Sequence, residues 1–470
     1  MDEQKKSGQN NFNSKVIAAV FVIGAFVAYL NGTLLTTALP TIMKDLNIDP
    51  ATGQWLTTAF MLVNGIVIPC TAFLIDKFTT RRLFFYSMGL FTIGTIIGAL
   101  SNSFGMLLIA RIIQAVGAGI ILPLMQTVFL VIFPKEKRGF AMGVIGIIIA
   151  FAPAIGPTLA GLMVDSYPWR DLFYIVVPIC VLDLIFGYFA LKNVTETKNV
   201  KLDMISVITS TVGFGGLLLG FSNAGNDGFD KPNVLIPLIV GIITLIIFVK
   251  RQLSKKEPML NLRVFKSRTF TFSTIIIMIV FAGLVSAELI LPMYIQMARG
   301  YSALDSGLML MPGAIIMGIM NPITGKLFDK IGARGLSITG LTLLTVGTFG
   351  LMELGLNTKI EYITAAYAVR LLGMSMFMMP LTTAGLNTLK TEDLAHGTAV
   401  NNTMRQIAGS IGTAILITVM SKASANSGIK NPQLATIHGM NVAFGVSAVL
   451  TLISLIIALI VVKKKVKVTN

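Results

Sequence analysis

Apolar residues in this chain form long blocks that are separated by short polar segments. A bilayer core about 30 Å thick is crossed by about 20 helical residues that rise 1.5 Å each, and the blocks have that length. They predict fourteen membrane-spanning helices, near 16–38, 54–75, 83–101, 105–132, 140–163, 172–191, 204–223, 233–249, 269–296, 307–327, 335–355, 361–389, 397–420 and 439–462. The expected fold is an all-α integral membrane protein. No polar segment is long enough for a soluble catalytic domain, so an enzyme is not expected.

One stretch of the sequence occurs twice, because residues 65–94 align with residues 318–347. The aligned positions share Gly65, Pro69, Asp76, Lys77 and Arg81 in the first copy and Gly318, Pro322, Asp329, Lys330 and Arg334 in the second. A duplicated membrane half is typical of secondary transporters, whose substrate site lies between the halves. The repeat places the second span over the tenth rather than the eighth, so two spans must be inserted between two six-helix halves.

The predicted organisation therefore has five parts. They are a cytoplasmic N-terminus at 1–15, a six-helix half at 16–191, an inserted segment at 192–268 with two spans and their flanking cytoplasmic parts, a second six-helix half at 269–462, and a basic cytoplasmic tail at 463–470.

Composition and charge fit this topology. Hydrophobic residues make up 54% of the chain and charged residues 12%, about half of the roughly 25% found in soluble domains. The net charge is +16, but most Lys and Arg fall in segments that alternation places in the cytoplasm, as the positive-inside rule describes. We expect contact with anionic membrane lipids and no nucleic-acid partner. Cys70 and Cys180 lie in different spans and the sequence has no metal-ligand cluster, so neither a disulfide nor a metal site is expected.

Both copies of the repeat place an Asp at the cytoplasmic end of a span, shortly before an Arg. Asp76 precedes Arg81, and Asp329 precedes Arg334. An Asp in this position can pair with an Arg or cap a helix, which would hold a cytoplasmic gate shut in one conformation and release it in another. Because these residues recur in both halves, we expect a gate; a simple topology anchor is the alternative.

Two further motifs lie in the fourth and fifth spans. Arg111 and Gln114 stand within a membrane helix, where an arginine is energetically expensive and normally faces a cavity or a partner. The fifth span contains prolines, which bend a helix, and small residues, which allow a neighbouring helix to approach closely. These residues are Pro153, Gly156, Pro157 and Gly161.

Together with Trp169, Arg170 and Phe173, the layout and motifs resemble the major facilitator superfamily, in its fourteen-span drug:proton antiporter branch. The resemblance covers nearly the whole chain, and the lincomycin-resistance type of multidrug exporter looks most similar. It implies a role for Arg111 in proton coupling, with a buried structural ion pair as the alternative. It also identifies the fifth-span residues as the antiporter motif, although simple helix packing would use the same residues.

The resemblance leaves the proton carrier open. Many members of the family have an acidic residue in the first span where this chain has Asn31, which cannot carry a proton. Two carboxylates lie deep within other spans, Glu288 in the ninth and Asp183 in the sixth. Removal from water favours the protonated form of a carboxyl, which a reversible carrier needs. Glu288 is favoured because its span corresponds to a cavity-lining helix of the family, whereas the span of Asp183 is peripheral.

The predicted substrate cavity combines polar residues with methionines, whose flexible side chains suit varied apolar ligands but also serve as ordinary filler. Its residues are Asn31, Gln114, Glu288, Arg370, Met374 and Met378. The sequence thus predicts a monomeric, proton-coupled multidrug efflux antiporter of the bacterial cytoplasmic membrane. It would export amphipathic drugs by alternating access, driven by the proton gradient and without a cofactor. The alternatives are an exporter of an endogenous metabolite or lipid, an uncoupled facilitator and, less favoured, a membrane enzyme or sensor.

Overall fold

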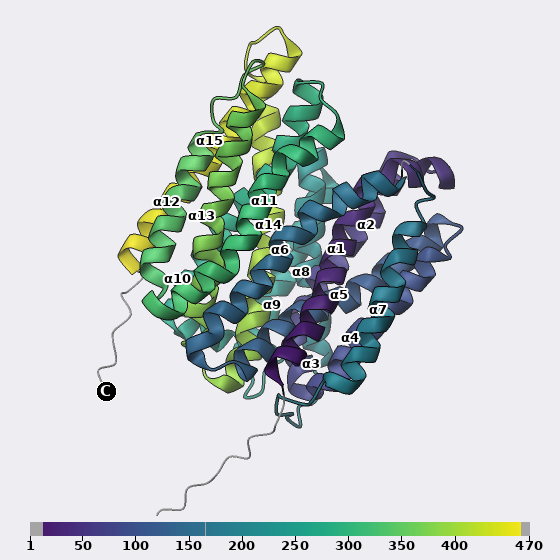
Figure 1. The fold of residues 1–470 in the computed structure, drawn as a ribbon, viewed down its shortest axis with the longest axis vertical. Helices are drawn as coiled ribbons and strands as arrows, with labels where there is room; N and C mark the ends of the chain where they lie inside the picture. Colours follow the sequence, from purple (N-terminus) through teal and green to yellow (C-terminus); the bar gives the residue numbers. More distant parts are fainter. Residues whose placement is uncertain (1–12, 165, 462–470) are drawn as a thin grey trace, which may run out of the picture.

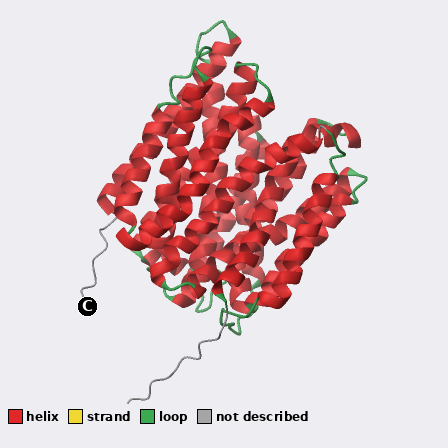
Figure 2. Ribbon diagram, viewed as in Figure 1, coloured by secondary structure: helices red, strands yellow, loops and turns green. Residues whose placement is uncertain are grey.

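The computed structural model describes residues 13–164 and 166–461, and this part of the chain folds into helices joined by loops (Figures 1 and 2). A helix lies at each predicted apolar block. The first half contains α1 Ser14–Leu46, α2 Pro50–Val67, α3 Thr71–Lys77, α4 Thr80–Ala99, α5 Phe104–Ile132, α6 Arg138–Val164 and α7 Asp171–Ala190. The inserted segment contains α8 Met204–Asp227 and α9 Pro232–Ser254. The second half contains α10 Arg268–Met293, α11 Ala303–Ile331, α12 Ala333–Phe349, α13 Ile360–Leu386, α14 Leu394–Ala425 and α15 Pro432–Val461.

The lengths of these helices suit a bilayer. Within the described residues, 13 helical segments are long and apolar enough to cross a membrane. The helix α12, which has 17 residues, packs beside α13 and α15 in the same bundle. The second span is continuous from α2 to α3 through a 3₁₀ turn at Ile68–Cys70. Pro69 lies in this turn, and proline lacks the N–H that would continue the α-helical hydrogen bonding.

Short polar residues begin and end several helices. The side chains of Ser103 and Ser267 accept hydrogen bonds from the first turns of α5 and α10, and Ser302 forms a capping box with Asp305 at the start of α11. These contacts satisfy backbone N–H groups that have no partner within the helix. The helix α1 ends at Asn47, which has a left-handed backbone conformation with φ 51°.

The bundle has a basic end, which we define as the end that carries the start of α1 and the linkers 191–203 and 255–267. It lies at the bottom of Figure 1. The linker residues include Lys198, Lys201 and Lys255. The sequence predicts that the basic end faces the cytoplasm.

The internal repeat is visible in the packing of helix pairs. A Cβ on Gly94 of α4 would lie 2.7 Å from the backbone N of Gln114 in α5, and a Cβ on Gly347 of α12 would lie 2.8 Å from the backbone N of Arg370 in α13. The pairs α4–α5 and α12–α13 therefore pack in the same way. The structural counterpart of Gln114 in the second half is Arg370.

The two halves meet directly along α6 and α11. A Cβ on Gly143 of α6 would lie 2.4 Å from the backbone O of Asn321 in α11, and a Cβ on Gly325 would lie 2.2 Å from the backbone O of Gly139. These distances leave no room for a side chain, so glycine permits the backbones to touch.

On the other side of the molecule the inserted segment packs against both halves. The helix α8 packs against α9, α14 and α2, and both inserted helices lie behind the two halves in the view of Figure 1. A Cβ on Gly65 of α2 would lie 2.4 Å from Leu218 of α8, while Ala224, farther along α8, packs with Ala414 of α14. The helix α8 therefore contacts both halves within the membrane-spanning region.

Candidate functional site

The first half contains a buried polar network around Arg111 of α5. The Nη1 of Arg111 donates to Oδ1 of Asn31 in α1 at 2.6 Å and to Oε1 of Gln114 at 3.1 Å. Its Nε donates to the backbone O of Leu56 at 3.3 Å, and the guanidinium lies 4.1 Å from the ring centroid of Phe60. Three residues that the sequence singled out are thus in one cluster. Asn31 accepts from Arg111 at the place where many family members have an acid.

The second half contains a related arrangement around Arg370 of α13. Gln114 donates to Thr95 Oγ1 at 3.0 Å in the first half, and Arg370 Nε is 3.2 Å from Thr348 Oγ1 in the second. Arg370 also donates through Nη2 to the backbone O of Gly283 in α10 at 2.8 Å. Its Nη1 is buried and has no hydrogen-bond partner within the described residues. One nitrogen of the Arg370 guanidinium is therefore buried without a hydrogen-bond acceptor in the part of the chain that the structure describes.

Glu288 of α10 lies where the two halves face each other. Its side chain is half-buried and is near enough to Arg370 and Tyr367 to interact electrostatically with both. Tyr29 of α1, in the opposite half, interacts electrostatically with Glu288 and with Arg405 of α14. The structure thus brings together the predicted cavity residues Glu288 and Arg370 and adds Tyr29, Tyr367 and Arg405 to them.

Asp183 of α7 has a different environment from Glu288. Its side chain is buried, and neither carboxylate oxygen has a hydrogen-bond partner within residues 13–164 and 166–461. A Cβ on Gly24 of α1 would lie 2.6 Å from Asp183 Oδ2 and 3.0 Å from Met88 of α4. Asp183 is therefore enclosed among helices of the first half and is removed from the contact between the halves.

The predicted apolar part of the cavity is packed into the core. Met374 and Met378 of α13 are each only 1% exposed and belong to the main hydrophobic cluster. They would contact a substrate only if neighbouring helices moved.

The antiporter motif joins α6 to α1 within the first half. A Cβ on Gly156 would lie 2.1 Å from Thr33 Oγ1, and a Cβ on Gly161 would lie 3.8 Å from the side chain of Thr37. Pro153 and Pro157 stand in the same stretch of α6. The glycines that touch the opposite half lie nearer the basic end of α6, at Gly139, Gly143 and Gly146. The motif did not identify them, although their spacing of four and three residues places them on one helix face.

Hydrogen bonds join the two halves toward the basic end. Thr127 Oγ1 of α5 lies 2.8 Å from Thr398 Oγ1 of α14, and Gln126 Oε1 accepts from Asn402 Nδ2 at 2.6 Å. Arg138 Nη1 donates to Asn387 Oδ1 at 2.9 Å. These contacts join residues more than 200 positions apart in the chain.

Both predicted gate carboxylates contact the opposite half. Asp329 of α11 accepts from the backbone N–H groups of Gly139 and Phe140, the second and third residues of α6, at 2.8 and 2.9 Å. A carboxylate at a helix N-terminus is favoured by the helix dipole and the unpaired N–H groups there. Asp76 of α3 pairs with His396 Nε2 of α14 at 3.3 Å and with Lys198 Nζ of the first linker at 3.1 Å.

The predicted gate arginines have other surroundings. Arg81 donates from Nη2 to the backbone O of Tyr188 at 2.8 Å, and its guanidinium lies 4.9 Å from the ring centroid of Tyr188. It therefore fastens α4 to α7 within the first half. Arg334 is half-buried near the start of α12. Lys198 and His396 were missed from the sequence because Lys198 lies in a linker and His396 has no sequence neighbour that would mark it as a partner of Asp76.

Two helical halves related by a repeat, a polar cluster between them and a multi-pass topology define a membrane transporter. The chain belongs to the Major Facilitator Superfamily, whose model matches residues 21–413, and this confirms the predicted family.

Relatives in sequence agree with this assignment, and a solved structure has a similar fold. Over 450 residues the chain is 53% identical to the uncharacterized MFS-type transporter YcnB of Bacillus subtilis (strain 168). The alignment covers 96% of this chain and 95% of YcnB. Over 459 residues it is 44% identical to the lincomycin resistance protein LmrB of the same organism, with 96% and 95% of the two chains covered. The crystal structure of the human organic anion transporter MFSD10 (TETRAN) has the same fold, with a TM-score of 0.69 at 14% identity over 95% of this chain and 99% of that one.

Proposed function

We propose that this chain is a proton-coupled multidrug efflux antiporter of the fourteen-span branch, placed in the bacterial plasma membrane with both termini in the cytoplasm. The name of LmrB supports drug export, because that relative is a lincomycin resistance protein. The observation that carries proton coupling is Glu288. It is a half-buried carboxylate that faces the opposite half and has no hydrogen-bond partner among the described residues. Intramembrane carboxylates in such positions mark proton and substrate pathways.

Alternating access supplies the mechanism. With the basic end closed, a proton from the opposite side neutralises Glu288 and removes its attraction for Arg370 and for a polar or cationic group on the drug. The drug then leaves. After the basic end opens, Glu288 releases its proton to the cytoplasm and becomes available to the next drug molecule. Competition between the proton and the drug for one site couples their opposite movements.

The charges around Glu288 favour some substrates over others. Arg111, Arg370 and Arg405 are all buried, and they outnumber the two carboxylates that lie deep within the spans, Glu288 and Asp183. We therefore infer that the substrates are amphipathic molecules that are neutral, zwitterionic or singly positive. A dication would meet one carboxylate and several guanidinium groups.

An uncoupled facilitator is the second candidate, and one observation favours it. Asn31 occupies the first-span position at which many family members have an acid, and its Oδ1 is already bound to Arg111. An exporter of an endogenous metabolite or lipid would share all of the geometry described above, and a panel of drugs and cell metabolites would distinguish it from a drug exporter.

The deciding experiment is transport by purified protein in proteoliposomes with an imposed pH gradient. We expect gradient-driven drug accumulation in the wild type and a loss of about tenfold or more in Glu288→Gln. Asp183→Asn is the matched control, because it also removes one buried carboxylate but lies away from the contact between the halves. Retention of gradient-driven transport in Glu288→Gln would show that Glu288 is not the carrier, and loss in Asp183→Asn alone would move the assignment to Asp183.

A further inference from the structure

The linker 191–203 is bound along the basic end of the first half. The backbone N–H of Lys198 donates to the backbone O of Asp76 at 2.7 Å, and Lys77 Nζ donates to the backbone O of Val200 at 3.0 Å. Thr80 Oγ1 lies 2.8 Å from Thr195 Oγ1. The linker thus follows the α3–α4 turn, next to the gate carboxylate Asp76 at the end of α3.

The same linker also reaches the second half. Lys198 Nζ pairs with Asp76 at 3.1 Å and donates to the backbone O of Glu392, just before α14, at 3.4 Å. One lysine from the inserted segment therefore contacts both halves at the place where they meet.

The second linker, 255–267, is bound to the second half. The backbone N–H of Asn261 donates to His396 Nδ1 at 3.1 Å, and Asn261 Nδ2 donates to Asp393 Oδ1 at 2.9 Å. Because Nδ1 accepts a hydrogen bond, the proton of a neutral His396 resides on Nε2 and points to Asp76. The second linker thereby fixes the tautomer that His396 needs to bind the gate carboxylate.

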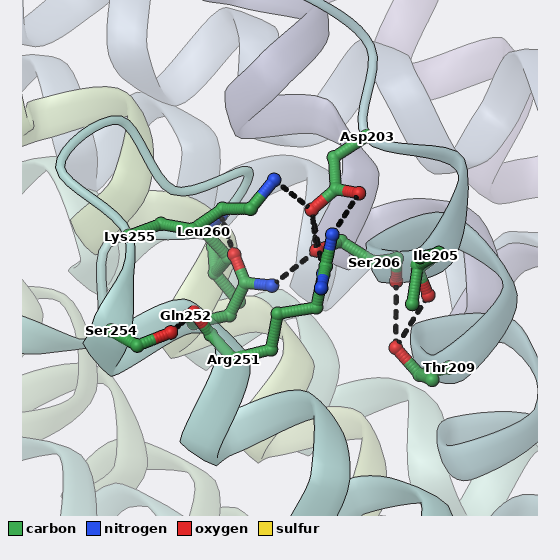
Figure 3. A network of polar contacts seen from close by, with 9 residues as sticks. All are labelled: Asp203, Ile205, Ser206, Thr209, Arg251, Gln252, Ser254, Lys255 and Leu260. Atoms are coloured by element: carbon green, nitrogen blue, oxygen red, sulfur yellow. Dashed lines mark hydrogen bonds and ion pairs between the residues drawn. The ribbon is translucent and has the colours of Figure 1, made fainter.

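A compact ionic cluster ties the two linkers together, as Figure 3 shows. Asp203, at the end of the first linker, accepts from Arg251 Nε and Nη2 at 2.9 and 2.8 Å and pairs with Lys255 Nζ at 2.5 Å. Gln252 completes the connection, since its Nε2 donates to Ser206 Oγ at 2.7 Å and its Oε1 accepts from the backbone N–H of Leu260 at 3.1 Å. A two-bond Arg–carboxylate contact is among the stronger and more directional polar contacts in proteins.

We propose that the inserted segment is a strap that holds the basic end closed, with Lys198 as the residue that positions Asp76 for closure and the Asp203 cluster as the fastening between the strap's two ends. The inference rests on the alternating access proposed above. The strap consists of the linker 191–203, α8, α9 and the linker 255–267. Its membrane part contacts both halves through α8, so the strap joins them both within the bilayer and at its surface.

Apolar residues of both linkers, such as Leu191 and Leu260, pack into the main hydrophobic core, whereas the contacts that join the strap to the gate carboxylate Asp76 are charged. A cavity of about 260 Å³ separates its two linkers, and its lining includes Asp76, Lys201, Asp203, Lys255 and Glu257. Lys198 is 43% exposed in its pair with Asp76, and exposed ion pairs are weak and screened by salt. The strap can therefore release when the halves move, and the closed state should lose population as ionic strength rises.

The test measures the distance between the halves at the basic end. Spin labels on Lys137→Cys and Lys390→Cys, which replace exposed residues of the two halves, are placed in the full chain with Cys70→Ala and Cys180→Ala. In lipid nanodiscs at fixed pH, we expect Lys198→Met to lower the ratio of closed to open basic ends by about two- to fivefold. Asp203→Asn should act in the same direction, and Lys198→Arg should restore the wild-type ratio.

Lys201→Met is the matched control. Lys201 is also an exposed lysine of the same linker, three residues after Lys198, and its substitution removes the same charge. A wild-type ratio in both Lys198→Met and Asp203→Asn would overturn the strap. An equal shift in Lys201→Met would also overturn it, since charge alone would then explain the effect. A wild-type protein whose distance does not respond to pH or drug would contradict alternating access itself, which distinguishes failure of the proposed function from failure of the strap.

Discussion

At the scale of single residues, the proposed transport mechanism needs a carboxylate that gains and loses its charge, whereas the proposed strap needs carboxylates that keep theirs. Glu288 has electrostatic neighbours and no hydrogen-bond partner within the described residues, so its charge can respond to a proton or a drug. Asp203 has two bonds from Arg251, an ion pair with Lys255 and a hydrogen bond from Ser206. The pKa of Asp203 lies well below its ordinary value, mainly because Arg251 donates hydrogen bonds to the carboxylate.

This difference predicts how each substitution depends on pH. An Asp with a lowered pKa contributes stability at every pH above its ordinary value of about 3.9, and that contribution is lost only as the pH falls below this value. The effect of Asp203→Asn on the closed basic end should therefore be the same at pH 5.5 and pH 8. The measurement is the spin-label distance ratio at both values, compared with wild type. A ratio of mutant to wild type that changed severalfold between them would show that Asp203 titrates in this range.

The sequence predicted some residues of the site and missed others. Arg111 and Gln114 were identified from the motif of the fourth span, and Asn31 from the missing acid of the first span; the structure places all three in one hydrogen-bonded cluster. Lys198 was not identified, because a lysine in a basic linker has no feature that distinguishes it from Lys192 or Lys201. Its role depends on the path of the linker over the α3–α4 turn, and long-range contacts of this kind leave no local pattern.

At the scale of helices, the length of the apolar blocks predicted where helices lie but not which helices contact one another. Each predicted block contains a helix because backbone groups in a bilayer must bond within their own segment. The repeat also predicted that two spans are inserted, and α8 and α9 occupy those blocks. Which helix faces which was not predictable in this way. The glycine motif of α6 packs on α1, whereas Gly143, outside the motif, is the position at which α6 touches the opposite half.

The contact of α6 with α11 can be tested by adding one methyl group. In Gly143→Ala the new Cβ would lie 2.4 Å from the backbone O of Asn321, so the two helices must separate. We expect a destabilisation of about 1–3 kcal/mol together with impaired transport. Thermal unfolding in detergent and uptake in proteoliposomes measure the two effects.

Gly89→Ala provides the control for this change. A Cβ on Gly89, within α4, would meet no atom within 4 Å, so this variant should unfold at the wild-type temperature or slightly above it, because alanine favours helix more than glycine does. Equal destabilisation of both variants would indicate that α6 and α11 do not need glycine for their contact.

At the scale of the whole molecule, the two interfaces between the halves are unlike. The helices α6 and α11 touch backbone to backbone, while on the other side α8 packs against both α2 and α14. The polar contacts that join Thr127 with Thr398 and Asp76 with His396 lie toward the basic end. The proposed alternating access would break these contacts in every transport cycle, and the proposed strap would release at the same time.

This requirement predicts that a covalent link at the basic end stops transport. Thr127 and Thr398 lie on opposite halves with their Oγ1 atoms 2.8 Å apart, which is near enough for two cysteine side chains to form a disulfide. In the background with Cys70→Ala and Cys180→Ala, the Thr127→Cys, Thr398→Cys double variant should lose transport on oxidation and regain it on reduction. Each single variant should be insensitive to oxidant. Transport that continued with the disulfide fully formed would mean that the basic end does not open during the cycle, and both alternating access and the strap would then be excluded.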